Sequence, residues 1–246
     1  MIEQTILEGF VSVRAALKSG SRDIYRILIR RDKWDRGVAW MEYAATNAGI
    51  PVERVDSDII DSFAEGSTHG GVVAAVGPRK FVDIGDIARD NAHPLVVMLD
   101  GVEDPFNFGQ AIRALYAAGA DGLIVRPRNW MSAAGVVARA SAGASEWIPT
   151  AIAETAQDAA DFFRARGLMI AVTTTDDDAA SIYDTDLKGS LFLVIGGEKR
   201  GITRSFLDQA DLRLEIPYAR DFDQSLGTAA AAAVLGFEIM RQRRSG

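Results

Sequence analysis

The first 80 residues mix apolar positions at helical spacing with short apolar runs. Helices are predicted over 9–19, 38–48 and 57–64, and strands over 24–29, 52–55 and 72–76. A charged stretch bounded by prolines, 79–94, follows and is typical of a linker with room for a helical turn. We therefore expect a compact α/β domain over 1–78 and a linker over 79–94.

From residue 95 onward, short apolar runs alternate with helical patterns. The runs are 95–99, 122–125, 147–150, 168–172, 191–195 and 212–216, and helices are predicted over 109–118, 132–140, 155–166, 203–209 and from about 228. Strands that are apolar at nearly every position are buried on both faces, as in a parallel sheet covered by helices. The sequence thus predicts an α/β domain over 95–246. The alanine run 229–233 indicates a helix packed closely against another backbone or a partner subunit.

The composition is that of an ordinary globular protein, with 48% hydrophobic and 25% charged residues. No apolar run approaches the roughly 20 residues that span a bilayer. The N-terminal segment MIEQTILEGF carries acidic residues and lacks a basic-then-apolar export signal. We expect a cytoplasmic protein that makes no use of a membrane.

The chain has no cysteine and only two histidines, His69 and His93. Disulfides, thiolate nucleophiles and cysteine-ligated metals are therefore excluded, and we expect chemistry without a metal. His93 precedes Pro94 and is interpreted as structural. For His69, in Ser-Thr-His-Gly-Gly, a role in a loop is favoured over catalysis.

The formal net charge is −7, and it is unevenly distributed. Residues 1–80 hold 11 Lys and Arg and 11 Asp and Glu, so the whole net charge comes from residues 81–246. Basic residues gather at Arg22, Arg26, Arg30, Arg31, Lys33 and Arg36, with Tyr25 and Trp34 among them. Such a set can contact phosphates and stack on bases. A solvated strand edge with aspartates at 23, 32 and 35 explains it equally well.

Three loops follow predicted strands of the second domain and carry polar groups and glycine. In the first, Asp100-Gly101 ends a strand, Asn107 is predicted to cap a helix that begins at Gly109, and Arg113 lies one turn inside that helix. Taken singly, these residues also fit a turn, a cap and a solvated arginine.

The second loop, Gly196-Gly197-Glu198-Lys199-Arg200-Gly201, matches neither a Walker loop nor a dinucleotide fingerprint. The third runs from Ile216-Pro217-Tyr218 to Ser225-Leu226-Gly227-Thr228, where the hydroxyls are more readily read as helix caps than as catalysts. In open parallel sheets, ligands bind beyond the carboxyl ends of the strands. We expect the three loops to form one pocket.

These segments resemble the SpoU (TrmH) family of RNA 2′-O-ribose methyltransferases, in the SPOUT class. DPFNFGQAIR resembles its first motif, VIGGEKRG the second and IPYARDFDQSLGTAA the third, and SAGASEWIP resembles a segment between the first two. The first 80 residues, including GVVAAV after His69-Gly70-Gly71, resemble the family's small α/β ribosomal-protein-like RNA-binding domain. The ordered set is much more specific than any single motif.

The resemblance implies a parallel-sheet SPOUT domain with a C-terminal trefoil knot, a homodimer and the cofactor S-adenosylmethionine. It places Gly196, Ile216 and Leu226 in the cofactor pocket, with Gly197, Gly201 and Thr173 beside it, and Asn107, Arg113 and Glu198 at the reacting end. RNA would be bound by Arg22, Arg26, Arg30, Arg31, Lys33 and His69. Ribosomal RNA is the first expected substrate and transfer RNA the second.

Arg113 cannot serve as an ordinary base, because a guanidinium keeps its proton. The resemblance assigns it to the substrate phosphate and to the developing alkoxide. The chain departs from the family at Gly227, where an asparagine is usual, and at Lys199-Arg200, where small or acidic residues are common. A catalytically weakened RNA-binding or ribosome-assembly homologue is therefore an alternative. A purely structural module and a nicotinamide enzyme are less favoured, the latter because its glycine fingerprint is missing.

Overall fold

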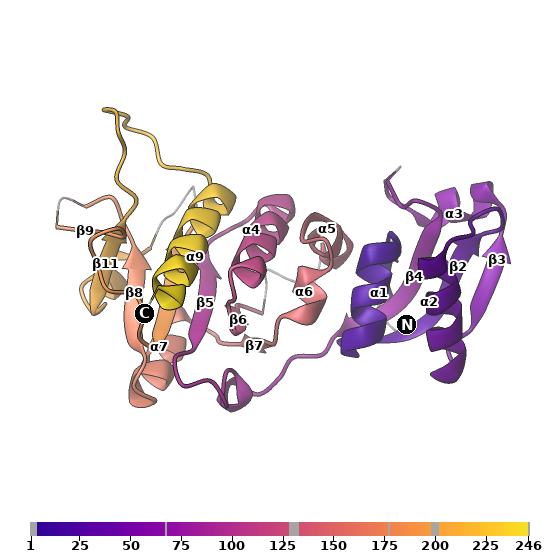
Figure 1. Cartoon of the computed structure of the whole chain (residues 1–246), viewed down its shortest axis with the longest axis horizontal. Coiled ribbons are helices and arrows are strands. Elements are labelled where there is room, and N and C mark those ends of the chain that lie inside the picture. The colour runs from indigo at the N-terminus through magenta and orange to yellow at the C-terminus, as the bar shows by residue number, and fades with distance from the viewer. Residues whose placement is uncertain (1–3, 67, 128–132, 177, 198–201, 246) are drawn as a thin grey trace. The chain divides into compact units, whose positions relative to one another are not determined.

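The computed structural model describes residues 4–66, 68–127, 133–176, 178–197 and 202–245. The chain divides into two compact units (Figure 1). Unit 1 comprises residues 1–80 and 133–147, and unit 2 comprises residues 81–132 and 148–246. The chain therefore passes between the units three times.

Unit 1 is a small mixed sheet with helices. Its elements are β1 (Thr5–Glu8), α1 (Phe10–Ser19), β2 (Arg22–Arg30), α2 (Arg36–Asn47), β3 (Val52–Val55), α3 (Ser57–Phe63), β4 (Val72–Arg79), α5 (Ala134–Ala140) and α6 (Ala144–Trp147). The strand order is β1-β4-β2-β3, with β4 antiparallel to both neighbours and β3 parallel to β2. Its core packs Leu7, Ile27, Ile29 and Met41 with no exposed surface. The helices and strands predicted here are confirmed within a few residues, and β1 is an additional strand.

Helices α5 and α6 belong to unit 1 although they follow the first strands of unit 2 in the sequence. The turn between them approaches α1 so closely that a Cβ on Gly143 would lie 2.8 Å from the Cβ of Ala15. Gly143 also has a φ of +79°, a conformation that favours glycine. The glycine in SAGAS thus permits this contact.

Unit 2 is built on a seven-stranded sheet. Its elements are η1 (Ile84–Asp86), β5 (Leu95–Asp100), α4 (Pro105–Ala117), β6 (Gly122–Val125), β7 (Thr150–Ile152), α7 (Ala156–Ala165), β8 (Met169–Thr173), β9 (Ala180–Ser181), β10 (Leu191–Gly196), α8 (Arg204–Leu207), β11 (Leu212–Glu215) and α9 (Thr228–Arg244). The strand order is β7-β6-β5-β10-β8-β11-β9, and all neighbours are parallel. The predicted parallel sheet is confirmed. The predicted trefoil knot stays a prediction.

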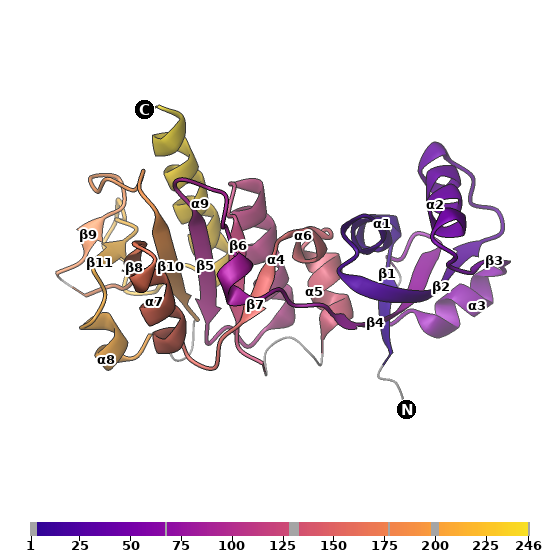
Figure 2. The same cartoon turned by 90° about the horizontal axis from the view of Figure 1, so that it is seen from below.

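Helices cover both faces of this sheet (Figures 1 and 2). α4 and α9 lie side by side over one face, and α7 lies over the other. Under α7, the rings of Phe163 and Phe192 stack with their centroids 4.9 Å apart, and both side chains are buried. The apolar strands Leu95–Asp100 and Leu191–Gly196 are therefore enclosed by helices, as their composition predicts. None of the helices in the described ranges has the length and apolar character needed to cross a bilayer.

The start of α4 differs from the prediction. The helix begins at Pro105, and the Asp104 side chain accepts a hydrogen bond from Asn107 N at 2.6 Å. The prediction that Asn107 is the cap is therefore wrong, and Arg113 lies more than two turns inside the helix. Asp followed by Pro is a strong start signal, because Asp caps the helix and Pro suits its first position.

Candidate active site

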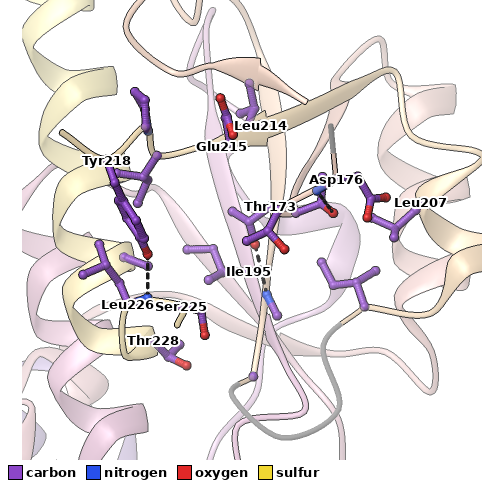
Figure 3. Close-up of a pocket in the computed structure, with 18 of the residues that line it drawn as sticks. Thr173, Asp176, Ile195, Leu207, Leu214, Glu215, Tyr218, Ser225, Leu226 and Thr228 are labelled. Carbon is purple, nitrogen blue, oxygen red and sulfur yellow. Dashed lines mark hydrogen bonds between the residues drawn. The ribbon is translucent and has the colours of Figure 1, made fainter. Parts of the chain in front are cut away.

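A pocket of about 650 Å³ opens at the carboxyl ends of three adjacent parallel strands, β10, β8 and β11 (Figure 3). The loop before α9 closes another side. The lining residues are Thr173–Asp176, Ile195–Gly197, Ile202, Leu207, Leu214–Tyr218, Phe222, Ser225, Leu226, Thr228 and Ala231. This is the edge at which open parallel sheets bind ligands, and the volume is that of a site for a small organic molecule.

Two glycines, Gly101 and Gly197, allow the loops after β5 and β10 to approach each other at the pocket. Gly197 N donates to Asp100 O at 2.7 Å. A Cβ on Gly197 would lie only 2.2 Å from Gly101 O, closer than any side chain tolerates. Across the pocket floor, Gly196 N donates to Thr173 Oγ1 at 3.3 Å. The backbone of β10 is thus fixed where it enters the pocket.

The loop from β11 to α9 is held by an aromatic side chain. The Tyr218 hydroxyl accepts a hydrogen bond from Leu226 N at 2.9 Å (Figure 3). The Tyr218 and Phe222 rings lie 6.1 Å apart. Gly227 caps α9 without any side-chain hydrogen bond, so the alternative that Ser225 or Thr228 caps this helix is not met. Both hydroxyl residues line the pocket instead.

Carboxylates lie in and beside the pocket. Asp176 and Glu215 line it, and Asp176 Oδ2 pairs with Arg204 Nη1 at 3.0 Å. Asp100, at the end of β5, is buried, and burial raises its pKa although Arg126, 2.9 Å away, opposes the shift. The pocket therefore combines apolar walls, backbone groups and acceptors, which suits a ligand with both apolar and hydrogen-bonding parts.

The structure brings together most of the predicted cofactor residues. Thr173, Gly196, Gly197, Ile216 and Leu226 line this one pocket. Sequence reasoning did not single out Asp176, Glu215 or Phe222. Their only signal was a place at or shortly after the end of a strand, or in the third loop. Glu198 and Gly201 lie outside the described residues.

Asn107 and Arg113 do not line the pocket of their own chain. Arg113 is exposed on α4, and Asn107 is half-buried in the first turn of the same helix. Phe106, seven residues before Arg113, is 53% exposed, and that spacing places both on one face of the helix. Arg113 and Phe106 therefore share one exposed helix face, about two turns apart.

Arg22 differs from the other arginines predicted to bind RNA because its side chain is buried in unit 1. Its Nε lies 3.0 Å from Glu146 Oε2, and Arg79 Nη1 lies 3.4 Å from the same oxygen. The Ser21 hydroxyl donates to Glu146 at 2.6 Å. Arg22 is thus not available to RNA in this structure, and the sequence could not show it because Glu146 lies over 120 residues away.

The Glu146 cluster shifts the ionisation of its members. Burial alone would raise the pKa of Glu146, but the charges of Arg22 and Arg79 outweigh it and the pKa is lowered. Burial lowers the pKa of Arg79 to about 10, against the opposing effect of Glu146. Glu146 and Arg79 therefore stay charged at neutral pH, and the buried charges of the cluster compensate one another.

A second hollow, of about 530 Å³, lies in unit 1 and is lined by Arg30, Ser57, Asp61, Ala64, Gly66, His69, Gly70 and Gly71. His69 is buried there, with Nδ1 accepting from Gly71 N at 3.2 Å and Nε2 3.1 Å from Asp61 Oδ1. This places the ring proton on Nε2. His69 thus orders the loop, as its sequence context suggested, and lies beside Arg30.

The other predicted RNA-binding residues lie around the same part of unit 1. Arg31 is exposed and pairs with Asp56 at 3.3 Å, and Lys33 Nζ lies 3.7 Å from Asp35. Arg26 instead lies over the Phe63 ring at 4.8 Å. The arginines of β2 are therefore unequal in their access to a ligand.

Two family models match the chain and divide it between them. Residues 94–237 match the SpoU rRNA Methylase family, and residues 6–82 match the model described as RNA 2′-O ribose methyltransferase substrate binding. The chain belongs to the SpoU rRNA methylase family. The second SpoU-associated match covers most of unit 1, so both parts of the resemblance seen in the sequence are confirmed.

Relatives cover the chain from end to end. It is 30% identical over 252 residues to the 23S rRNA (guanosine-2′-O-)-methyltransferase RlmB of Shewanella oneidensis, covering 100% of both chains. RlmB of Pseudomonas aeruginosa is 31% identical, covering 96% of this chain and 95% of the relative. The AdoMet-bound rRNA methyltransferase of Sinorhizobium meliloti superposes with a TM-score of 0.80 at 25% identity, covering 97% of this chain and 87% of the other.

Proposed function

We propose that this SpoU family member is an S-adenosylmethionine-dependent RNA 2′-O-ribose methyltransferase that acts on ribosomal RNA. The observation that carries the proposal is the pocket at the ends of β8, β10 and β11. The second and third predicted motif loops and the segment after β8 line it, whereas the expected contribution of the first motif loop is not found among the described residues of the chain. The RlmB relatives and the AdoMet-bound neighbour support the substrate and the cofactor. Transfer RNA is the second candidate substrate, and a ribosomal RNA substrate fits a cytoplasmic location.

The residues of the pocket fit S-adenosylmethionine. Ile216 and Leu226 offer apolar contacts for a purine, and Gly196 and Gly197 line the pocket without side chains. The carboxylate of Glu215 provides an acceptor for hydroxyl or ammonium groups. When bound, the cofactor supplies a methyl group activated by a sulfonium centre.

The task of the protein is then to position a ribose hydroxyl and to accept its proton. We assign Arg113 to the RNA phosphate beside that hydroxyl and to the oxygen on which negative charge develops, because a fixed guanidinium binds both kinds of oxygen. The phosphate can take the proton. Such catalysis depends on alignment, and it requires no metal. Within the described residues, no three His, Cys, Asp or Glu side chains gather in a way that could hold a metal ion.

Arg113 reaches a pocket most simply if the site is completed by a second chain. It lines no part of its own pocket and is exposed on the same helix face as Phe106. An interface through that face would cover Phe106 and carry Arg113 toward the partner. We therefore propose a homodimer in which each pocket receives Arg113 of the other chain.

Replacing Arg113 by alanine tests the proposed chemistry. Because Arg113 contacts RNA and not the cofactor, Arg113→Ala should lower methyl transfer by at least about a hundredfold, as for loss of a charge-stabilising group. The affinity for S-adenosylmethionine should stay within about twofold. Transfer of radiolabelled methyl to ribosomal RNA and isothermal titration with the cofactor measure the two effects.

A matched control is Arg89→Ala, which removes an exposed arginine that pairs with Asp86 three residues earlier. It should methylate as the unchanged protein does. Full activity of Arg113→Ala would refute the role of Arg113. A wild-type chain that binds the cofactor but methylates no RNA would instead favour the weakened homologue suggested by Gly227, which caps α9 without a side chain.

A further inference from the structure

Trp34 is an exposed aromatic side chain that the fold holds in a fixed position. It lies between β2 and α2, and 74% of its surface is exposed. A single exposed apolar residue needs no explanation by itself. Trp34 is different because a cation, itself anchored at several points, covers one face of the indole.

That cation is Arg54 of β3, whose guanidinium carbon lies 4.0 Å from the centre of the Trp34 ring. Arg54 Nε donates to Glu42 Oε1 at 2.7 Å, and Nη1 donates to the carbonyl oxygens of Lys33 and Arg30 at 2.6 and 3.3 Å. The acceptors thus come from α2 and from the part of the chain just before Trp34. Arg54 is thus a rigid support that orients the indole before any ligand binds.

The surroundings of Trp34 favour a polyanion. The segment RRDKWDR, residues 30–36, has four basic and two acidic residues in a chain of net charge −7. Arg31 and Arg36 are exposed on either side of Trp34. An open indole face between exposed guanidinium groups is the combination that binds unpaired nucleotides, with bases on the ring and phosphates on the cations.

The segment also adjoins the hollow of unit 1. A Cβ on Gly71 would lie 3.0 Å from the Cβ of Arg30 and 3.4 Å from the Cδ of Lys33. Gly71 and Arg30 both line the hollow that contains His69. A strand of RNA whose base rests on Trp34 can therefore continue into a polar depression.

We propose that Trp34, supported by Arg54, is a stacking platform for an unpaired base of the RNA substrate. The proposal rests on the proposed function, because it assigns the way in which unit 1 holds that RNA. Because an indole ring stacks on all four bases, Trp34 is expected to bind an unpaired base without selecting its identity.

Binding of a short fluorescein-labelled oligoadenylate to the full chain tests the platform. Trp34→Ala should weaken binding roughly tenfold, and Trp34→Phe should retain most of the affinity because a ring remains. An abasic ribose-phosphate oligomer of equal length carries the same charge without bases. The wild-type chain should bind it more weakly, and Trp34→Ala should leave that binding unchanged.

Salt dependence separates stacking from phosphate contact. Trp34→Ala should lower the affinity equally at every salt concentration, because stacking releases no counterions. Arg36→Ala should instead flatten the slope of log K against log salt by about 0.7, the value for one phosphate contact to a single strand. Tyr43→Ala, which removes an aromatic side chain that is 68% exposed in the same unit, is the matched control and should bind as wild type.

Three results would overturn the proposal: wild-type affinity in Trp34→Ala, equal wild-type affinity for the two oligomers, or an equal loss in Tyr43→Ala. The second result would show that the chain binds the phosphate backbone and not the bases. Methylation of ribosomal RNA distinguishes this proposal from the proposed function. If the wild type methylates RNA, and Trp34→Ala changes neither oligoadenylate binding nor the KM for RNA, only the stacking proposal fails. If the wild type binds oligoadenylate through Trp34 but methylates no RNA, only the methyltransferase proposal fails.

Discussion

Arg22 and Arg113 show how much the role of a residue depends on contacts that the sequence does not reveal. Both are basic residues in promising patterns, yet Arg22 is buried against Glu146 and Arg113 is exposed. Charge pattern alone predicts a cation and not its partner. In contrast, Gly196 and Gly197 were predicted correctly to lie at one pocket with Ile216, because their positions follow from strand ends and from motif order.

The Glu146 cluster yields a prediction about stability. Glu146→Gln removes the carboxylate but leaves two guanidinium groups buried, so the free energy of unfolding should fall by about 3 kcal/mol or more. Urea denaturation followed by tryptophan fluorescence measures the loss. Asp56→Asn, which disrupts the exposed pair with Arg31, is the control and should cost less than about 1 kcal/mol. Equal losses in the two variants would contradict the importance of burial.

The same cluster predicts a pH dependence. The pKa of Glu146 is lower in the folded chain than its ordinary value of 4.5, so the folded state binds this proton more weakly than the unfolded state. The stabilisation by Glu146 should therefore be complete above about pH 4.5 and should disappear as the pH falls below it. Glu146→Gln should lack this component, so the stability difference between the two proteins should shrink in acid. If the stability difference between wild type and Glu146→Gln did not change with pH, the proposed ionisation of Glu146 would be excluded.

At the scale of elements, periodicity and strand composition predicted most of the fold. Long apolar runs and the helix over 228–244 were found because their signals are local and strong. The sequence analysis missed the two-residue strand β9 and the four-residue helix α6. Segments this short do not show a recognisable alternation of apolar and polar residues. The start of α4 was misplaced because Gly109 was taken as a boundary, whereas Asp104 and Pro105 determine it.

The crossing of the loops after β5 and β10 gives a prediction at this scale. Gly197→Ala places a methyl group 2.2 Å from Gly101 O, so one loop must move. We expect a loss of about 1–3 kcal/mol in stability and a large loss of cofactor affinity. Gly189→Ala is the control, since nothing lies within 4 Å of its Cβ and it should be neutral. Thermal unfolding and titration with S-adenosylmethionine measure the two effects in both variants. Normal cofactor affinity in Gly197→Ala would show that the pocket does not depend on the close approach of these two loops.

At the scale of the whole molecule, the proposed homodimer makes each site depend on two chains. Phe106→Asp should place a charge in the interface, giving monomers in sedimentation velocity and little methyl transfer. Val82→Asp, at an apolar residue that is 41% exposed elsewhere in unit 2, should remain dimeric. Mixing Arg113→Ala with Gly197→Ala chains should restore part of the activity, because one site in the mixed dimer has both intact groups. No recovery on mixing would place Arg113 and the pocket in the same chain.

The return of residues 133–147 to unit 1 also determines how the molecule can be divided. A fragment that starts at residue 95 would carry α5 and α6 without the strands and helix that cover them, and Glu146 would lose both arginines. Conversely, proteolytic cleavage between residues 80 and 95 should not separate two fragments. The N-terminal part would stay packed against α5 and α6, which belong to the same unit. The segment 79–94, which the sequence predicts to be a linker, is therefore a poor place to truncate the chain.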